Sequence, residues 1–280
     1  MKIDKEQLKR LAANPDFISG IYNYCDRWCE RCPYTARCMN YALGQEEFPD
    51  EESRDIRNTR FWDQLTETLQ ASLDLLREMA AEDGIDLDAV DSTAALEEEE
   101  RRWELAQAHH CSAASEAYIG KVDEWLDAAE DLFREKEEVL VTAARLNLLG
   151  TKLEQEADAL KDAVEVIRWY QFQIHVKLMR ALQSRYDEAG MPADLAAEFA
   201  EHGKDSDGSA KVALIGMDRS LAAWGLLLRA FPEREAETLE LLVHLGRLRR
   251  AVEQEFPQAR AFVRPGFDEV ESIWMPAAEP

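Results

Sequence analysis

The chain has 280 residues, and its 57 acidic and 33 basic side chains give it a net charge of −24. Such an acidic protein repels the phosphate backbone, so no nucleic-acid partner is expected. No stretch approaches about 18 uninterrupted apolar residues and the N-terminus carries no apolar secretion signal, so we expect no membrane association and a cytoplasmic location.

The composition predicts an all-α protein. Ala, Leu, Glu and Arg are abundant, there are only 12 Gly and 9 Pro, and apolar residues recur at helical spacing. The expected helices, in chain order, cover 4–13, 53–82, 93–149 (with a break near Gly120), 151–189, 209–230 and the residues between Pro232 and Pro257. Long helices joined by short connections favour an elongated antiparallel helical bundle.

Three regions follow from this pattern. Residues 1–50 are expected to form an N-terminal helix and a small cysteine-rich metal-binding lobe, residues 51–256 the bundle, and residues 257–280 a tail packed on or near it. Phe267 and Trp274 are the side chains expected to anchor that tail. Residues 201–210 (EHGKDSDGSA) indicate a flexible loop. Helix 53–82 carries an apolar stripe made of Trp62, Leu65, Leu69, Leu73, Leu76 and Met79.

Four of the five cysteines lie in one loop, YCDRWCERCPYTARCMNY, with the spacing C-x3-C-x2-C-x5-C. On a helix, Cys25, Cys29 and Cys32 would share one face, Pro33 would end the helix, and Cys38 would return as a fourth ligand. In a cytoplasmic chain, clustered thiols indicate a metal or catalytic site more than disulfides.

Zinc and iron–sulfur are both compatible with four clustered thiols. Structural zinc usually takes two short cysteine pairs separated by a dozen or more residues, whereas all four cysteines here lie in one segment. One loop can wrap around a [4Fe–4S] cluster, and Cys-Pro endings occur in such loops. The spacing therefore favours a [4Fe–4S] cluster on Cys25, Cys29, Cys32 and Cys38, with zinc as the alternative.

The segment CERCPYTARC resembles the C-x2-C-P-x4-C end of the [4Fe–4S] loop in the endonuclease III and adenine-mismatch DNA glycosylase family. The resemblance covers about fourteen residues, 25–38, and implies the same cluster on the same four cysteines. That family places its first cysteine six residues before the second, whereas three residues separate Cys25 from Cys29. The rest of the chain lacks the family's helix–hairpin–helix context, so glycosylase activity is not expected.

Other metal and catalytic patterns are weaker. C-x3-C-x2-C is also the spacing of radical enzymes that bind S-adenosylmethionine, but those enzymes leave one iron open and sit in a βα barrel. None of the histidines gives the Glu-x2-His pattern of di-iron bundles. His109 with Glu116, and Glu165 with His175, lie at semi-buried helical positions and are interpreted as hydrogen-bonded bundle residues, and Cys111 as a small core residue.

Two functions follow. The first is a [4Fe–4S] protein with a redox or sensing role and a redox partner. The second is a non-enzymatic interaction protein in which zinc is structural and the acidic surface docks a basic protein. No catalytic signature indicates a reaction.

Overall fold

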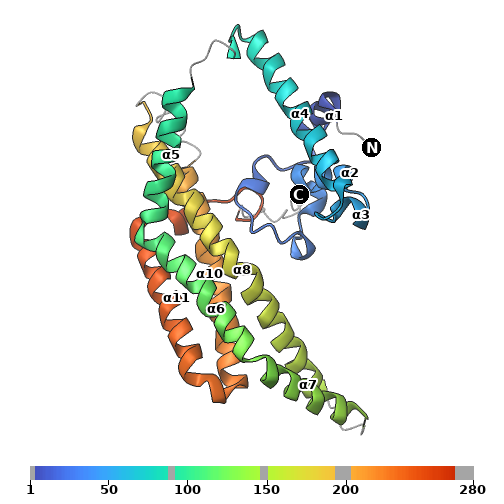
Figure 1. The fold of residues 1–280 in the computed structure, drawn as a ribbon, viewed down its shortest axis with the longest axis vertical. Coiled ribbons are helices and arrows are strands. Elements are labelled where there is room, and N and C mark those ends of the chain that lie inside the picture. The colour runs from blue at the N-terminus through green and yellow to red at the C-terminus, as the bar shows by residue number, and fades with distance from the viewer. Residues whose placement is uncertain (1–3, 88–91, 146–150, 193–202, 269–280) are drawn as a thin grey trace, which may run out of the picture. The chain divides into compact units, whose positions relative to one another are not determined.

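The computed structural model describes residues 4–87, 92–145, 151–192 and 203–268, and over these residues the protein is an all-α helical bundle (Figure 1). Its internal contacts divide the chain into two compact units. The first, here called the cysteine unit, comprises Met1–Glu97 and Arg264–Pro280. The second, the bundle unit, comprises Glu98–Val263. The chain therefore leaves the cysteine unit once and returns to it near the C-terminus.

The cysteine unit contains four helices along its described N-terminal part: α1 (Lys5–Ala12), α2 (Met39–Glu47), α3 (Glu51–Arg54) and α4 (Thr59–Glu82). Three 3-10 turns precede α2, namely η1 (Ile21–Asn23), η2 (Cys29–Arg31) and η3 (Thr35–Arg37). Helix α4 contacts α1, α2 and α3. On α1, Lys5 and Lys9 lie 2.8 and 3.1 Å from the Glu78 carboxylate of α4.

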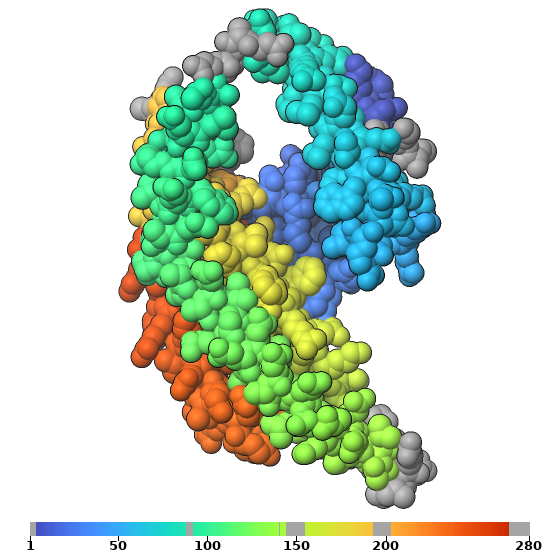
Figure 2. Space-filling view, viewed as in Figure 1, coloured from blue at the N-terminus to red at the C-terminus, as the bar shows by residue number. Residues whose placement is uncertain are grey.

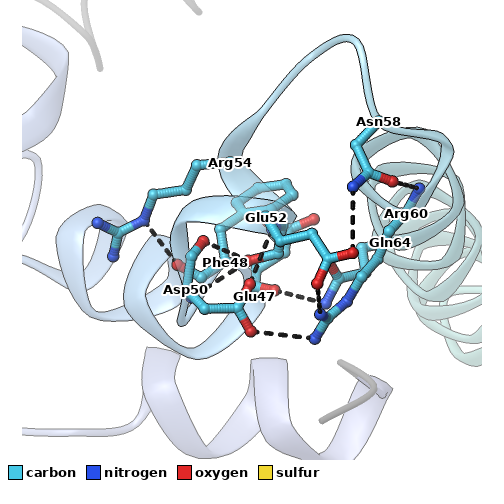
Figure 3. A network of polar contacts seen from close by, with 9 residues as sticks. Glu47, Phe48, Asp50, Glu52, Arg54, Asn58, Arg60 and Gln64 are labelled. Carbon is cyan, nitrogen blue, oxygen red and sulfur yellow. Dashed lines mark hydrogen bonds and ion pairs between the residues drawn. The ribbon is translucent and has the colours of Figure 1, made fainter.

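Polar contacts fix the turns between α2, α3 and α4 (Figure 3). Asp50 and Ser53 form a capping box at the start of α3, and the Asn58 side chain caps α4 through the Arg60 N–H. Arg60 lies 3.2 Å from the Asp50 carboxylate, and the Gln64 amide donates to the Glu47 carbonyl at 2.8 Å. These caps break the helix predicted over 53–82 into α3 and α4, which is a correction to the predicted bounds.

The bundle unit consists of α6 (His110–Ala128), α7 (Glu130–Arg145), α8 (Thr151–Gly190), α10 (Asp205–Ala230) and α11 (Glu235–Glu255), with the 3-10 turns η5 (Pro232–Arg234) and η6 (Ala259–Ala261). Helix α5 (Thr93–Ala108) crosses the boundary between the units. Helix α6 packs on α8 and α11, and α10 packs on the same two helices. Figure 2 shows α6 in green lying against α8 in yellow and α11 in orange on the visible face.

Neighbouring helices of the bundle unit are antiparallel. In each pair of helices, residue numbers that rise along one helix are matched with numbers that fall along the other. Ser112–Met179 and Asp123–Gln171 join α6 to α8. Ala114–His244 and Trp125–Thr238 join α6 to α11, and Arg180–Asp205 and Tyr170–Arg219 join α8 to α10. The antiparallel bundle predicted from the sequence is therefore confirmed for this unit.

Aromatic side chains occupy the bundle core. Trp125 and Trp224 pack edge to face with ring centroids 5.0 Å apart, and both are buried. The Trp224 ring N–H donates to the Tyr118 hydroxyl at 2.8 Å, and the Trp125 ring N–H donates to the Thr238 hydroxyl at 2.9 Å. Both ring N–H groups and the Tyr118 hydroxyl thus have a partner, which offsets the cost of burying these polar atoms.

Two predicted boundaries in this region are wrong. The helix predicted over 93–149 is interrupted at His109 and Ala129, and Gly120 lies inside α6. The loop predicted over 201–210 overlaps α10, which begins at Asp205, while residues 201 and 202 lie outside the described residues. The Asp205 carboxylate accepts from Arg180 and Ser184 at 2.7 Å each, and these contacts tie the start of α10 to α8.

The division into units also differs from the predicted one. The predicted boundary at residue 50 separates α4 from the cysteine lobe, whereas α4 packs on α1, α2 and α3. Residues from Arg264 onward, predicted to pack on or near the bundle, belong to the cysteine unit. Trp274, predicted to anchor the tail, lies outside the described residues.

The apolar stripe on α4 is exposed. Thr68, on another side of the helix, is buried, whereas Trp62, Leu69, Leu73, Leu76 and Met79 are each about half exposed. Helix α4 therefore packs within its unit through the Gln64–Thr68 side and leaves the predicted stripe uncovered.

Candidate metal centre

The four loop cysteines line one pocket of the cysteine unit. Cys25, Cys29, Cys32 and Cys38 are all half-buried and free of disulfides. The other side chains around the pocket are largely apolar or aromatic, and they include Ile21, Tyr22, Trp28, Tyr41 and Phe267. Thiols that converge on a small apolar pocket provide the donor set of a thiolate metal or iron–sulfur site.

The segment that carries Cys25, Cys29 and Cys32 brings these thiols to the pocket without forming an α-helix. Arg27 has φ of 59°, a left-handed conformation that is uncommon for a residue with a side chain and often occurs at functional sites. This reversal separates Cys25 from the η2 turn that begins at Cys29. The prediction that Cys25, Cys29 and Cys32 share a helix face is therefore wrong, because the chain turns between the first two.

Two tight turns and a helix end position the remaining thiols. The Cys32 N–H donates to the Cys29 carbonyl and the Cys38 N–H donates to the Thr35 carbonyl, each at 3.2 Å. Cys38 is the N-cap residue of α2. The positive end of the helix dipole favours a negative group at that position, such as a thiolate.

Aromatic residues cover the pocket. The Arg31 guanidinium stacks over the Trp28 ring, 4.0 Å from its centroid. The Phe267 ring lines the pocket and packs edge to face on Tyr34, with centroids 5.1 Å apart. Both contacts shield the thiols from water, and solvent exposure is one of the factors that tune an iron–sulfur site.

Gly266 allows the C-terminal segment to approach the loop region. Its φ is +73°, and a Cβ at this position would lie 2.9 Å from Ile18 Cδ1 and 3.0 Å from Ile21 Cδ1. Ile21 lines the same pocket as the cysteines. A side chain at residue 266 would therefore strain the left-handed backbone and crowd Ile18 and Ile21.

The thiols interact electrostatically. Burial raises the pKa of Cys29, and negative charge on Cys25, Cys38, Glu30 and Cys32 raises this pKa further. Burial also raises the pKa of Cys32, while the Tyr34 N–H, which donates to its sulfur at 3.4 Å, lowers it. Several thiolates in this pocket repel one another, so a cation or cationic cluster among them removes a repulsion.

Among the described residues, His109, His110 and Cys111 form a group whose ligand atoms all lie within 4.8 Å of one another. The four loop cysteines share one pocket instead. Both zinc and an iron–sulfur cluster use thiolate donors, and the placement of all four cysteines in a single loop favours the cluster.

The group of His109, His110 and Cys111 could also bind a metal, and the sequence analysis did not single it out as one site. The Cys111 sulfur lies 3.4 Å from His110 Nε2. However, His109 is the N-cap of α6, and its Nδ1 accepts the Cys111 N–H at 3.2 Å. This bond puts the ring proton on Nε2, 3.9 Å from a Glu255 carboxylate oxygen, so metal binding at His109 would sacrifice the cap. Cys111 is fully buried and burial raises its pKa to about 11, which confirms it as a core residue.

The remaining candidates do not form a site. His175 Nδ1 lies 2.9 Å from the Ser115 hydroxyl, which fits the predicted hydrogen-bonded role. Glu116 and Glu165 are exposed, so the prediction that they occupy semi-buried positions is wrong. No helix in the described parts of the chain has the length and apolarity needed to cross a membrane.

Known proteins give no further assignment. Comparison with protein-family models, with curated proteins and with solved structures finds no match to this chain.

Proposed function

We propose that this chain is an iron–sulfur protein in which Cys25, Cys29, Cys32 and Cys38 bind a [4Fe–4S] cluster with a redox or sensing role. The observation that carries the proposal is the convergence of all four thiols, from one fourteen-residue loop, on one apolar pocket. When bound, such a cluster would supply one-electron chemistry.

The surrounding residues support a site with tuned solvent access. Trp28 and Phe267 line the pocket and limit the exposure of the half-buried thiols, and the Tyr34 N–H donates to the Cys32 sulfur. Hydrogen bonds to cluster sulfurs and limited exposure both shift the reduction potential of iron–sulfur sites. A redox protein partner and a reducing compartment such as the cytoplasm belong to this proposal, because free thiols persist where glutathione keeps them reduced.

The test is the metal content of the full-length chain purified without oxygen. We expect about four irons and four acid-labile sulfides per chain, little zinc, and reversible bleaching of the visible absorption on reduction. One zinc per chain, without iron or sulfide, would overturn the proposal and favour the structural-zinc alternative with an acidic docking surface. A cluster that cannot be reduced reversibly would remove the redox role and leave sensing through cluster loss.

The control is the group at His109, His110 and Cys111. Cys111→Ser leaves the four loop thiols intact, so iron and sulfide content should be unchanged. A matching loss of iron in Cys111→Ser would instead locate the metal in the bundle unit.

A further inference from the structure

Helix α4 presents an apolar stripe that the other described residues of the cysteine unit leave exposed. The exposed fractions are 55% for Trp62, 57% for Leu69, 49% for Leu73, 57% for Leu76 and 53% for Met79. Together these side chains expose on the order of 500 Å² of apolar surface, which is as large as the largest patch on a typical monomer. The largest apolar patch of a monomer is often functional, so the stripe is a candidate interaction surface.

A coiled-coil seam can be drawn along the stripe. Trp62, Leu65, Leu69, Leu76 and Met79 occupy seam positions that alternate in steps of three and four, Ser72 occupies the remaining position, and Leu73 lies beside the seam. A repeat of 3.5 residues on average keeps a seam facing another helix along its whole length. At 24 residues, α4 is long enough for three such heptads.

The flank of the seam is free of acidic side chains over most of its length. Thr66, Leu73 and Ala80 directly follow the seam positions 65, 72 and 79, and all three are uncharged. The chain has 57 acidic residues, and carboxylates at these positions would repel the same carboxylates on an identical helix. Their absence favours pairing of α4 with itself.

We propose that α4 is a homodimerisation helix, which packs its stripe against α4 of a second copy of this chain. Two copies would bury on the order of 1,000 Å² through the stripes, the area a specific interface needs. The interface is separate from the metal centre, since the residues that line the thiol pocket lie between Ile21 and Tyr41 and at Phe267, outside α4.

The test is the mass of the full-length protein by sedimentation over a range of concentrations. The expected particle has twice the 32.0 kDa chain mass. Leu69→Lys combined with Leu76→Lys should give a monomer with unchanged circular dichroism, because both side chains are already exposed. The matched control is Val139→Lys, also exposed but on α7, which should leave the dimer intact.

A second variant tests the seam itself. Ser72 occupies a seam position and is half-buried. Ser72→Leu should tighten the dimer by about tenfold or more, because each copy then adds a leucine to the interface.

Three outcomes would overturn the proposal. The first is a wild-type protein that is monomeric at every concentration. The second is a dimer that survives Leu69→Lys with Leu76→Lys, because it would use another surface. The third is a monomer whose melting temperature drops with these lysines, because the stripe would then pack against another part of the same chain.

Discussion

Phe267 packs its ring edge-on against Tyr34, with the centroids 5.1 Å apart, and so brings residues from the C-terminal segment onto the cysteine loop. We predict that Phe267→Ala opens the thiol pocket to solvent and to chelators. Bound metal should be lost several-fold faster to a chelator while the helix content stays unchanged. Phe172→Ala on α8, where the ring is 52% exposed, is the matched control and should leave the rate unchanged.

The four loop cysteines should act as one set. Serine in place of Cys25, Cys29, Cys32 or Cys38 removes one sulfur ligand, so each variant should bind less metal than the wild type, by iron, sulfide and zinc analysis. Full metal content in Cys38→Ser would show that the site uses three cysteines and would reopen the comparison with S-adenosylmethionine radical enzymes.

Metal binding should weaken on acidification. Metal ligation needs thiolates, and burial raises the pKa of Cys29 and of Cys32, so these thiols are protonated at neutral pH without metal. Binding therefore releases protons, and affinity falls as the pH is lowered. A metal competition titration at pH 6 and pH 8 measures this, and equal affinities at the two pH values would contradict ligation by Cys29 and Cys32.

Glu47 lowers the stability of the cysteine unit at neutral pH. Its side chain is only 7% exposed, its Oε1 has no hydrogen-bond partner, and burial raises its pKa above the ordinary 4.5. The folded state thus favours the protonated acid, and stability falls as the pH rises from 4.5 through the raised pKa. We expect Glu47→Gln to raise the unfolding free energy at pH 7 by about 1 kcal/mol.

The pH dependence separates this effect from a change in packing. Below about pH 4.5 the carboxyl is protonated in both states, so the gain from Glu47→Gln should disappear in urea unfolding at pH 4. Asp63→Asn, an exposed change on α4, should have no effect at either pH. A gain that persists at pH 4 would mean that the amide forms new contacts instead.

Close packing of α8 and α10 predicts a contrast between two glycines of α10. A Cβ at Gly216 would lie 2.8 Å from Tyr170 Cδ1 and 3.2 Å from Ile174 Cγ1, whereas a Cβ at Gly225 meets nothing within 4 Å. Gly216→Ala should lower the melting temperature, with a loss of about 1–3 kcal/mol. Gly225→Ala should raise stability by up to about 1 kcal/mol, because alanine favours the helix. Equal effects would contradict the close α8–α10 contact.

Most helices could be predicted from the sequence because apolar residues recur at helical spacing over many residues, as in α8 and α11. The break of the long third helix was predicted at Gly120, where the structure has open space and a continuous helix. The helix is interrupted instead at His109 and Ala129, and at His109 an imidazole nitrogen acts as the N-cap acceptor. Histidine is not among the usual N-cap residues, so local propensity could not indicate this position.

The sequence predicted which residues form the candidate site, but not how the backbone arranges them. The spacing of the cysteines identified Cys25, Cys29, Cys32 and Cys38, but not the left-handed Arg27 that turns the chain between the first two. The cover by Phe267 depends on a contact more than 220 residues away along the chain, which no local pattern indicates. The α4 stripe has the right helical period for a core helix, and only the packing of Thr68 shows which side faces inward.

The cysteine unit is discontinuous: Met1–Glu97 requires Arg264 and the residues after it for completion, and the bundle unit lies between them in the chain. During translation, residues emerge from the ribosome in order, and a domain forms once its residues are available. Phe267 is thus synthesised after the entire bundle unit. The cysteine loop therefore lacks the Phe267 ring while the bundle unit is being synthesised, and the cluster we propose would have access to a more open pocket during that interval.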